Sequence, residues 1–219
     1  PGSSLTWWSG IEPVNNAASF VLGDSDGGLV VLSGATDITD GAWHHVVAVR
    51  DRSLGANGQN LLYVDGLLDV AALDATYNDG FYSATAELNI GYWNFQSTTP
   101  SNHLGGKIDE VALYDRALTA AEIEDHYNDG LAGRDYCLSS AAFVPFPDDT
   151  ISLWNLDEAN GPDYVDSFNG NDGTGNADPT AVTGQINGAQ EFDGLTTGID
   201  VPADRSFNWT VDESFTIEF

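Results

Sequence analysis

The sequence predicts an all-β protein, an antiparallel sandwich with one short helix. Between residues 43 and 50 successive side chains alternate between two faces, which is the two-residue period of a strand in a sheet. Residues 50–59 are rich in Gly, Asn and Ser, and residues 60–65 then form a returning strand that ends at an Asp-Gly pair. Residues 40–66 are therefore predicted to be a long β-hairpin with one apolar face. A helical pattern occurs at residues 118–127.

Length and charge limit the possible functions. A chain of 219 residues is long enough for one large or two small domains with a real core. It has 34 acidic and 6 basic residues, a formal charge of −28. This excess argues against binding to nucleic acid or to anionic membranes, because both require Lys and Arg. It suits a hard cation such as calcium or a salty medium, although solvated acidic loops explain most of the carboxylates.

Cysteine usage and the absence of targeting segments limit the class of protein further. Cys137 is the single cysteine, so an internal disulfide and a CxxC metal site are excluded. No apolar run reaches membrane-spanning length, no signal peptide opens the chain, and Met is absent. We expect a piece of a longer, secreted protein.

The first predicted strand lies within residues 1–13 and contains the pair Trp7 and Trp8. Two interpretations of the pair stay open. Aromatic faces stack on sugar rings, so the pair predicts a carbohydrate platform; alternatively, one ring lies in the core and the other is half exposed. Residues 19–22 and 28–33 follow as a hairpin around a Gly- and Asp-rich turn.

The central hairpin carries two histidines, and a ligand-type loop follows it. No Ser or Cys nucleophile motif accompanies His44 or His45. Because His45 shares a face with Val47, we predict a hydrogen-bonded core imidazole there. Residues 67–73 and 86–93 are further strands, and the loop between them carries aromatic residues around an Asn-Asp-Gly triplet. Such loops bind ligands at a sandwich rim, but they also simply make turns.

Residues 107–115 alternate again and lead into the helix. Asp109 falls on the same face as apolar residues of this strand, where a carboxylate is costly unless it is paired, hydrogen-bonded or bound to a metal. In the following segment Thr119 and Glu122 form a Thr-x-x-Glu capping box, and Gly130 is predicted to stop the helix.

Several motifs in one order carry a family resemblance. They are DGAWHHVVAVRD and LYVDG within residues 40–66, LNIGY at 88–92 and GGKIDEVALYDRALTAAEI at 105–123. Over residues 18–130 the chain resembles the laminin-G-like, concanavalin A-type domain of bacterial surface proteins. The resemblance implies a jelly-roll sandwich and an extracellular or cell-surface location.

The C-terminal part of the sequence resembles the beginning of the same family. Its motifs at 151–176, 184–207 and 212–219 are like the opening strands, which in the family precede the hairpin. We therefore expect residues 1–135 to complete one laminin-G-like domain, residues 136–149 to be a linker, and residues 150–219 to begin the next domain. A circular permutation would give the same order, but residues 215–219 alternate as a core strand up to the last residue, so we favour a window on a tandem array. The core partners of that strand are then expected in another chain.

A calcium site is the strongest chemical candidate. Residues 166–173 form a turn packed with carboxylate and amide oxygens, the donors that Ca²⁺ prefers. In the resembled family such a motif lies beside the IDEV strand and binds calcium with it. The resemblance implies Asp166, Asn171 and Asp109 as ligands, with Glu158 as a further candidate; an Asx turn that satisfies its own backbone is the alternative. In an array, Asp109 and Asp166 of one chain would lie a domain's width apart.

The predicted function is non-catalytic. Glucanases of the same jelly-roll class need two carboxylates at a fixed spacing in one strand, which residues 107–115 lack, and one Cys and four His provide no triad. We predict a structural or adhesive module of a repetitive surface or filament-forming protein, stabilised by calcium and associating head to tail with copies of itself. The alternative is a carbohydrate-binding module whose partner is an extracellular glycan. The residues of that alternative site are Trp7, Tyr82 and Trp93. Neither nucleic acid nor membrane insertion is expected.

Overall fold

The computed structural model describes residues 6–23, 28–72, 77, 87–93, 102–134 and 149–219. Within these residues the chain is an antiparallel β-sandwich with one α-helix and one short 3₁₀ turn, so the predicted all-β fold is confirmed. Residues 136–148 of the predicted linker, Cys137 among them, and Tyr82 lie outside the described residues.

Two sheets form the main sandwich. The front sheet has the order β1-β2-β3 and consists of β1 (Thr6–Glu12), β2 (Ala17–Gly23) and β3 (Leu29–Asp37). The back sheet has the order β12-β11-β18-β4-β5-β6. Its strands are β4 (Val46–Asp51), β5 (Gln59–Val64), β6 (Leu67–Ala72), β11 (Val111–Tyr114), β12 (Thr150–Trp154) and β18 (Phe215–Glu218).

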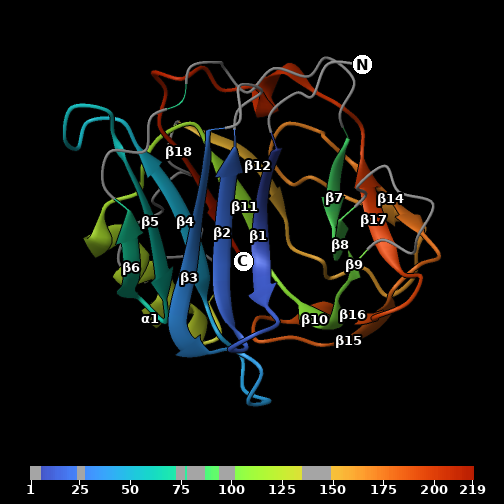
Figure 1. The fold of residues 1–219 in the computed structure, drawn as a ribbon. Coiled ribbons are helices and arrows are strands. Elements are labelled where there is room, and N and C mark those ends of the chain that lie inside the picture. The colour runs from blue at the N-terminus through green and yellow to red at the C-terminus, as the bar shows by residue number, and fades with distance from the viewer. Residues whose placement is uncertain (1–5, 24–27, 73–76, 78–86, 94–101, 135–148) are drawn as a thin grey trace.

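Three smaller sheets lie to one side of the sandwich (Figure 1). The first, in the order β13-β14-β17-β7, comprises β7 (Leu88–Ile90), β13 (Asp163–Tyr164), β14 (Gly173–Asn176) and β17 (Gly198–Val201). The second, in the order β10-β16-β15, comprises β10 (Gly105–Ile108), β15 (Thr180–Thr183) and β16 (Gly188–Asp193). The third pairs β8 (Tyr92–Trp93) with β9 (Asn102–His103).

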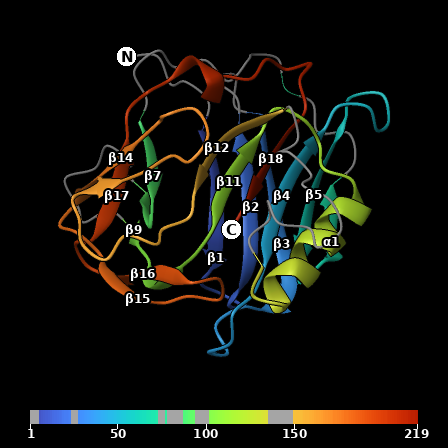
Figure 2. The same ribbon diagram turned by 180° about the vertical axis from the view of Figure 1, so that it is seen from behind.

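The back sheet is buried on both faces except at its edge strand β6. Alternate residues of β4 belong to different clusters: Val46 and Ala48 pack in the main core with the front sheet, whereas Val47 and Val49 pack under α1 (Ala120–Leu131). Figure 2 shows the helix on the outer side of this sheet. The expectation of one apolar face for the hairpin is therefore wrong, because the helix covers the second face.

The helix itself follows its sequence signals at the start. The Thr119 side chain accepts from the Glu122 backbone N–H, and the Glu122 carboxylate accepts from the Thr119 N–H, so the capping box is confirmed. Gly130 does not stop the helix, which ends one residue later. Gly133 instead has a positive φ of 64° just beyond the end, where only a residue without Cβ is unstrained.

The two segments of the chain close on each other within one molecule. Strand β18 is hydrogen-bonded between β11 and β4, so residues 215–218 lie inside the back sheet (Figures 1 and 2). Ile217 pairs with Leu113 on one side and Ala48 on the other, and Phe219 exchanges backbone hydrogen bonds with Val46 at 2.8 and 3.0 Å. The expectation that this strand has its core partners in another chain is therefore wrong for this chain.

The closure also corrects the expected separation of the two proposed calcium residues. Val111, two residues after Asp109, pairs with Trp154, and Trp154 forms a bridge to Asp166. Asp109 and Asp166 consequently belong to one sandwich and are not separated by the width of a domain. The division of the chain into parts of two successive domains stays a prediction.

Candidate functional site

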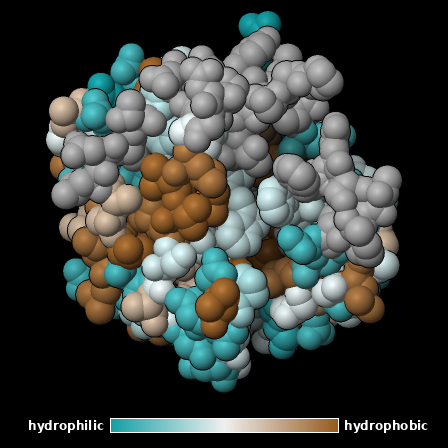
Figure 3. Space-filling model, viewed as in Figure 1, coloured by the Kyte–Doolittle hydropathy of each residue, from teal (hydrophilic) through white to brown (hydrophobic). Residues whose placement is uncertain are grey.

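The outward side of the front sheet carries an apolar surface. Because paired residues of antiparallel strands point to the same side, Trp8 and Val21 lie together on the face opposite the core, and Val31 pairs with Val21. Val31 is 50 % exposed and Leu29, farther along β3, is 64 % exposed. We call Trp8, Val21, Leu29 and Val31 the outer apolar face. Figure 3 shows a brown hydrophobic area over the front sheet on the side facing the viewer.

The two tryptophans of β1 have different roles. Trp7 packs against the main core opposite Leu22, whereas Trp8 lies on the outer apolar face. The structure agrees with the interpretation in which one tryptophan ring faces the core. Trp7 is thus turned away from a ligand on the outer face, and Trp8 takes its place as the candidate contact residue.

Trp8 has an aromatic neighbour from a distant part of the chain. Its ring centroid lies 6.5 Å from that of Trp93 on β8, with the ring planes tilted by 38°. A Cβ at Gly10 would come within 2.9 Å of the Trp8 ring, so a glycine at this position lets the indole lie over the strand. Both tryptophans are partly exposed, and together they extend the outer apolar face. The predicted partner Tyr82 lies outside the described residues.

The strand that carries Trp93 is held by polar contacts. Tyr92 stacks on His103 with ring centroids 5.1 Å apart and hydrogen-bonds Asp200 through its hydroxyl. Asn89 donates to Asp200 at 2.8 Å and lies 3.1 Å from the Tyr92 hydroxyl. Burial, together with the Asp200 carboxylate, raises the pKa of Tyr92 to about 12. These contacts fix the position of the neighbouring Trp93.

The acidic loop expected to bind calcium organises its own backbone. The two Asp166 carboxylate oxygens accept four backbone N–H groups, those of Leu153, Phe168, Asn169 and Asn171. The Asn171 side chain donates to Ser152, and its backbone carbonyl accepts from the Trp154 indole. These contacts have the form of the Asx turn, the alternative to a calcium site. They provide hydrogen bonds for the carboxylate of Asp166, which is only 5 % exposed.

Glu158 and Asp109 each keep one unused carboxylate oxygen. Glu158 accepts from the Val165 N–H with one oxygen, and its other oxygen is buried without a hydrogen-bond partner among the described residues. Asp109 is 7 % exposed; one of its oxygens accepts from the Ile186 N–H at 2.9 Å and the other lacks a partner within the described ranges. Burial, with a smaller contribution from Asp157, raises the pKa of Asp109 to about 7, against the lowering effect of nearby backbone N–H groups.

The four predicted ligands do not fit one ion together. Asp166 and Asp109 have different hydrogen-bond donors, from residues 153–171 and residue 186 respectively. Within the described part of the chain no three His, Cys, Asp or Glu side chains form a group that could hold a metal. Asp109 and Glu158 each keep one oxygen without a partner in the described part of the chain, and Asp109 is the one whose burial raises its pKa.

A buried His–Glu network joins the two segments of the chain beneath α1. Glu218 is fully buried; His45 Nε2 lies 2.6 Å and His126 Nδ1 3.0 Å from its Oε1 atom. Burial opposes the charge of Glu218, but the two imidazoles hold its pKa well below its usual range. The prediction of a hydrogen-bonded core imidazole at His45 is confirmed. Its partner was missed, because the two residues lie 173 positions apart in the sequence.

Comparison with known proteins assigns the family. A laminin-G family model, described as the concanavalin A-like lectin/glucanases superfamily, matches residues 2–124. The chain belongs to this superfamily. No match was found among curated proteins or solved structures. The match covers the front sheet, the central hairpin and the start of the helix, whereas residues 125–219 lie outside it.

Membership of the concanavalin A-like superfamily agrees with the resemblance drawn from the sequence motifs and with the observed sandwich. It indicates a lectin-type, carbohydrate-binding or adhesive module. Domains of the laminin-G type are typically extracellular. No helix in the described part of the chain is long and apolar enough to cross a membrane.

Proposed function

We propose that this chain is a non-catalytic, extracellular structural or adhesive module, and that it makes contact through the outer apolar face. One observation carries the proposal. In a chain of charge −28, the aliphatic side chains of Leu29 and Val31 are at least half exposed and lie beside two partly exposed tryptophans. On soluble proteins an apolar patch of this kind marks an interaction site. Exposed residues on β3 from Leu29 to Ala35 carry no charge, which favours an apolar partner surface.

The partner we propose is a second copy of the chain. Two outer apolar faces that meet would bury the same residues from both copies, which is a self-complementary contact. The β18 strand is already paired within the chain, so association needs no exchange of core strands. This proposal replaces the head-to-tail pairing of half-domains by contact between complete sandwiches.

The proposal is tested by sedimentation velocity over a series of protein concentrations. The weight-average sedimentation coefficient should rise with concentration for the wild-type chain and stay constant for Val31→Lys. Leu195→Lys is the matched control, because Leu195 is 72 % exposed but lies in a turn away from the face. A wild-type chain that remains monomeric throughout would contradict the proposed self-contact.

A catalytic function lacks support from the arrangement of ionisable groups. The buried Glu218 and its imidazoles lie between the back sheet and α1, under side chains of the second core cluster. The Asp166 carboxylate is occupied by backbone donors. A pair of carboxylates that works on a glycosidic bond must reach substrate and water, and the described groups are used for structure instead.

Carbohydrate binding is the second candidate, and the Trp8–Trp93 pair favours it. Two tilted, partly exposed indoles 6.5 Å apart offer apolar faces on which sugar rings can stack. Calorimetric titration with neutral oligosaccharides tests this function, with Trp93→Ala as the variant that should lose binding. Absence of any heat of binding at millimolar sugar would remove the candidate.

We further propose that calcium stabilises the module through Asp109 and its acidic neighbour Asp157, a narrower set than the sequence predicted. The support is the oxygen of the buried Asp109 that has no partner among the described residues, and the burial that, with a smaller contribution from Asp157, raises its pKa. A divalent ion bound only to the folded state adds stability by mass action, about 1–3 kcal/mol at saturating ion. Chelation should therefore lower the melting temperature, and an unchanged melting curve in excess chelator would contradict calcium binding.

A further inference from the structure

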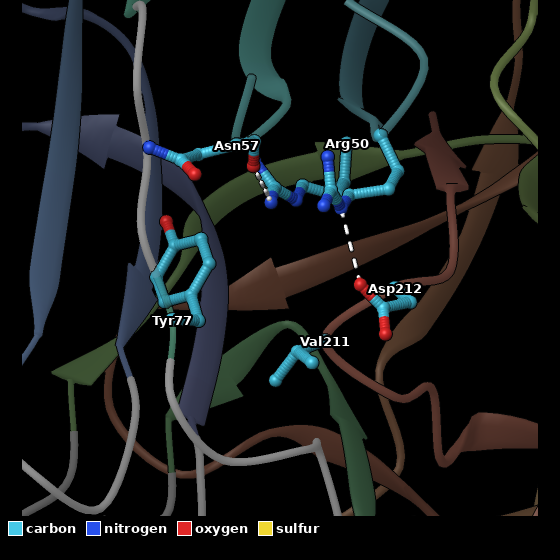
Figure 4. Close-up of a pocket in the computed structure, with 6 residues that line it drawn as sticks. Arg50, Asn57, Tyr77, Val211 and Asp212 are labelled. Carbon is cyan, nitrogen blue, oxygen red and sulfur yellow. Dashed lines mark hydrogen bonds and ion pairs between the residues drawn. The ribbon is translucent and has the colours of Figure 1, made fainter. Parts of the chain in front are cut away.

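A small hollow lies at the far end of the β4–β5 hairpin, away from the outer apolar face. It is open to solvent and offers about 50 Å³ of space. Its lining residues come from β4, the following turn, the segment before β18 and one residue of a distant loop, and they are Arg50, Arg52, Asn57, Tyr77, Val211 and Asp212. Figure 4 shows the labelled side chains around this space.

Arg50 is a buried cation with no carboxylate partner among the described residues. Its side chain is 1 % exposed. Its two terminal nitrogens donate to neutral oxygens, the Asn60 side-chain carbonyl at 3.3 Å and the Asn57 backbone carbonyl at 2.6 Å. The Nε atom has no hydrogen-bond partner among the described residues. A desolvated charge with a free donor is costly to the fold unless a counter-charge is supplied.

The guanidinium is held in one orientation. Its carbon atom lies 5.0 Å from the centre of the Tyr77 ring, a cation–π contact. On another side Gly58 approaches so closely that a Cβ there would come within 2.9 Å of the guanidinium. Burial lowers the pKa of Arg50, yet an arginine side chain stays protonated in proteins. The hollow is thus built around a fixed positive charge.

A second arginine stands at the rim with a replaceable partner. Arg52 Nε lies 3.3 Å from Asp212 Oδ1, and the Asp212 side chain is 78 % exposed. Such an exposed ion pair is worth little in water. Two of the six Lys and Arg residues in the whole chain therefore line one hollow, against the strongly negative charge elsewhere.

We infer that this hollow is a binding site for a small oxyanion, a carboxylate or sulfate group, with Arg50 as its buried cation and Arg52 as its cation at the rim. The incoming group takes the place of Asp212 beside Arg52 and supplies a counter-charge that the described residues do not give Arg50. Free inorganic sulfate and the acidic group of a sugar offer the same chemistry. The site is separate from the outer apolar face and does not depend on the proposed function.

Calorimetric titration at low ionic strength tests the site with three probes: sodium sulfate, sodium glucuronate and glucose. We expect sulfate and glucuronate to bind and glucose to give no heat. Glucuronate at least tenfold tighter than sulfate identifies an acidic sugar as the occupant, and equal affinities identify the bare oxyanion. No binding of either anion overturns the inference.

Two residues at the rim, Arg52 and Asp212, provide variants that leave the buried Arg50 in place. Arg52→Gln should weaken anion binding, and Asp212→Asn should tighten it about two- to fivefold, because a competing exposed ion pair is removed. Glu124→Gln on α1 changes the net charge equally but lies on an element that does not line the hollow. If Glu124→Gln tightens binding as much as Asp212→Asn, only net charge matters and the site is refuted.

Discussion

Replacing Asp109 by Asn tests the burial of this carboxylate and the calcium proposal together. Asn keeps the size of the side chain and an oxygen that can accept from the Ile186 N–H. The pKa of Asp109 is raised from 3.8 to about 7 by burial. A carboxyl pKa that is raised by folding means that the folded state favours the protonated form of Asp109. The stability that this protonated form contributes is complete below pH 3.8 and is lost as the pH rises through about 7. Full ionisation costs the folded state up to about 4 kcal/mol.

The assay is urea unfolding followed by tryptophan fluorescence, in chelator, at pH 5 and pH 8.5. Asp109→Asn should be more stable than the wild type by about 2–4 kcal/mol at pH 8.5, and much closer to it at pH 5. With saturating calcium at pH 8.5 the wild type should gain stability, whereas the variant should gain little. Asp163→Asn, which removes an exposed carboxylate, is the control for net charge.

Two results would refute this reasoning. If Asp109→Asn destabilises the protein equally at both pH values, the carboxylate is not strained by burial and its unpaired oxygen has a partner in solution. If calcium stabilises the wild type and Asp109→Asn by the same amount, the ion binds elsewhere. In that case the acidic loop around Asp166 is the next site to test.

Three further predictions concern the closure of the sandwich and the helix. Ile217→Ala should lower the free energy of unfolding by about 2–5 kcal/mol, because it leaves a cavity at a 2 % exposed position in the middle of the back sheet. Urea titration measures this loss, and a loss below about 1 kcal/mol would contradict the central position of Ile217. Glu218 raises the pKa of His126 against the effect of burial, so Glu218→Gln should lower that pKa and shift the NMR titration of the His126 ring to lower pH. The stability that the wild type loses as the pH rises through this pKa should then be absent from the variant. An unmoved titration would contradict the pairing. Thr119→Ala should lower the free energy of unfolding by about 1 kcal/mol, because it removes the helix cap. Thr183→Ala is the control at an exposed position, and equal melting temperatures for the two variants would contradict the stabilising role of the cap.

The fold was largely predictable because its signals are local. Alternation from Val46 to Arg50, the Asp-Gly turn at 65–66 and the Thr119–Glu122 box each act within a few residues, although the strand starts at Val46 and not at Trp43 as predicted. Asp109 is buried as predicted, but the predicted strand 107–115 is wrong there: Asp109 lies in a break between β10 and β11, where Glu110 has a positive φ of 53°.

What the sequence left undetermined depends on long-range contacts. The two-residue period of β1 cannot tell which of Trp7 and Trp8 faces the core, since that phase is set by pairing with β2. The four backbone donors to Asp166 could not be predicted either, because they approach only when the loop folds. Arg50 drew no attention because nothing local distinguishes a buried arginine in a strand from an exposed one.

Amide hydrogen exchange of β18 at two protein concentrations tests the central claim that one chain closes its own sandwich. The amides of Thr216 and Ile217 should be strongly protected, to a degree similar to those of Ala48 in β4, because they bond to strands of the same chain. This protection should be unchanged when the protein is diluted a hundredfold. Loss of protection on dilution, while β4 and β5 stay protected, would show that another chain supplies the partners of β18 and would contradict the closed sandwich.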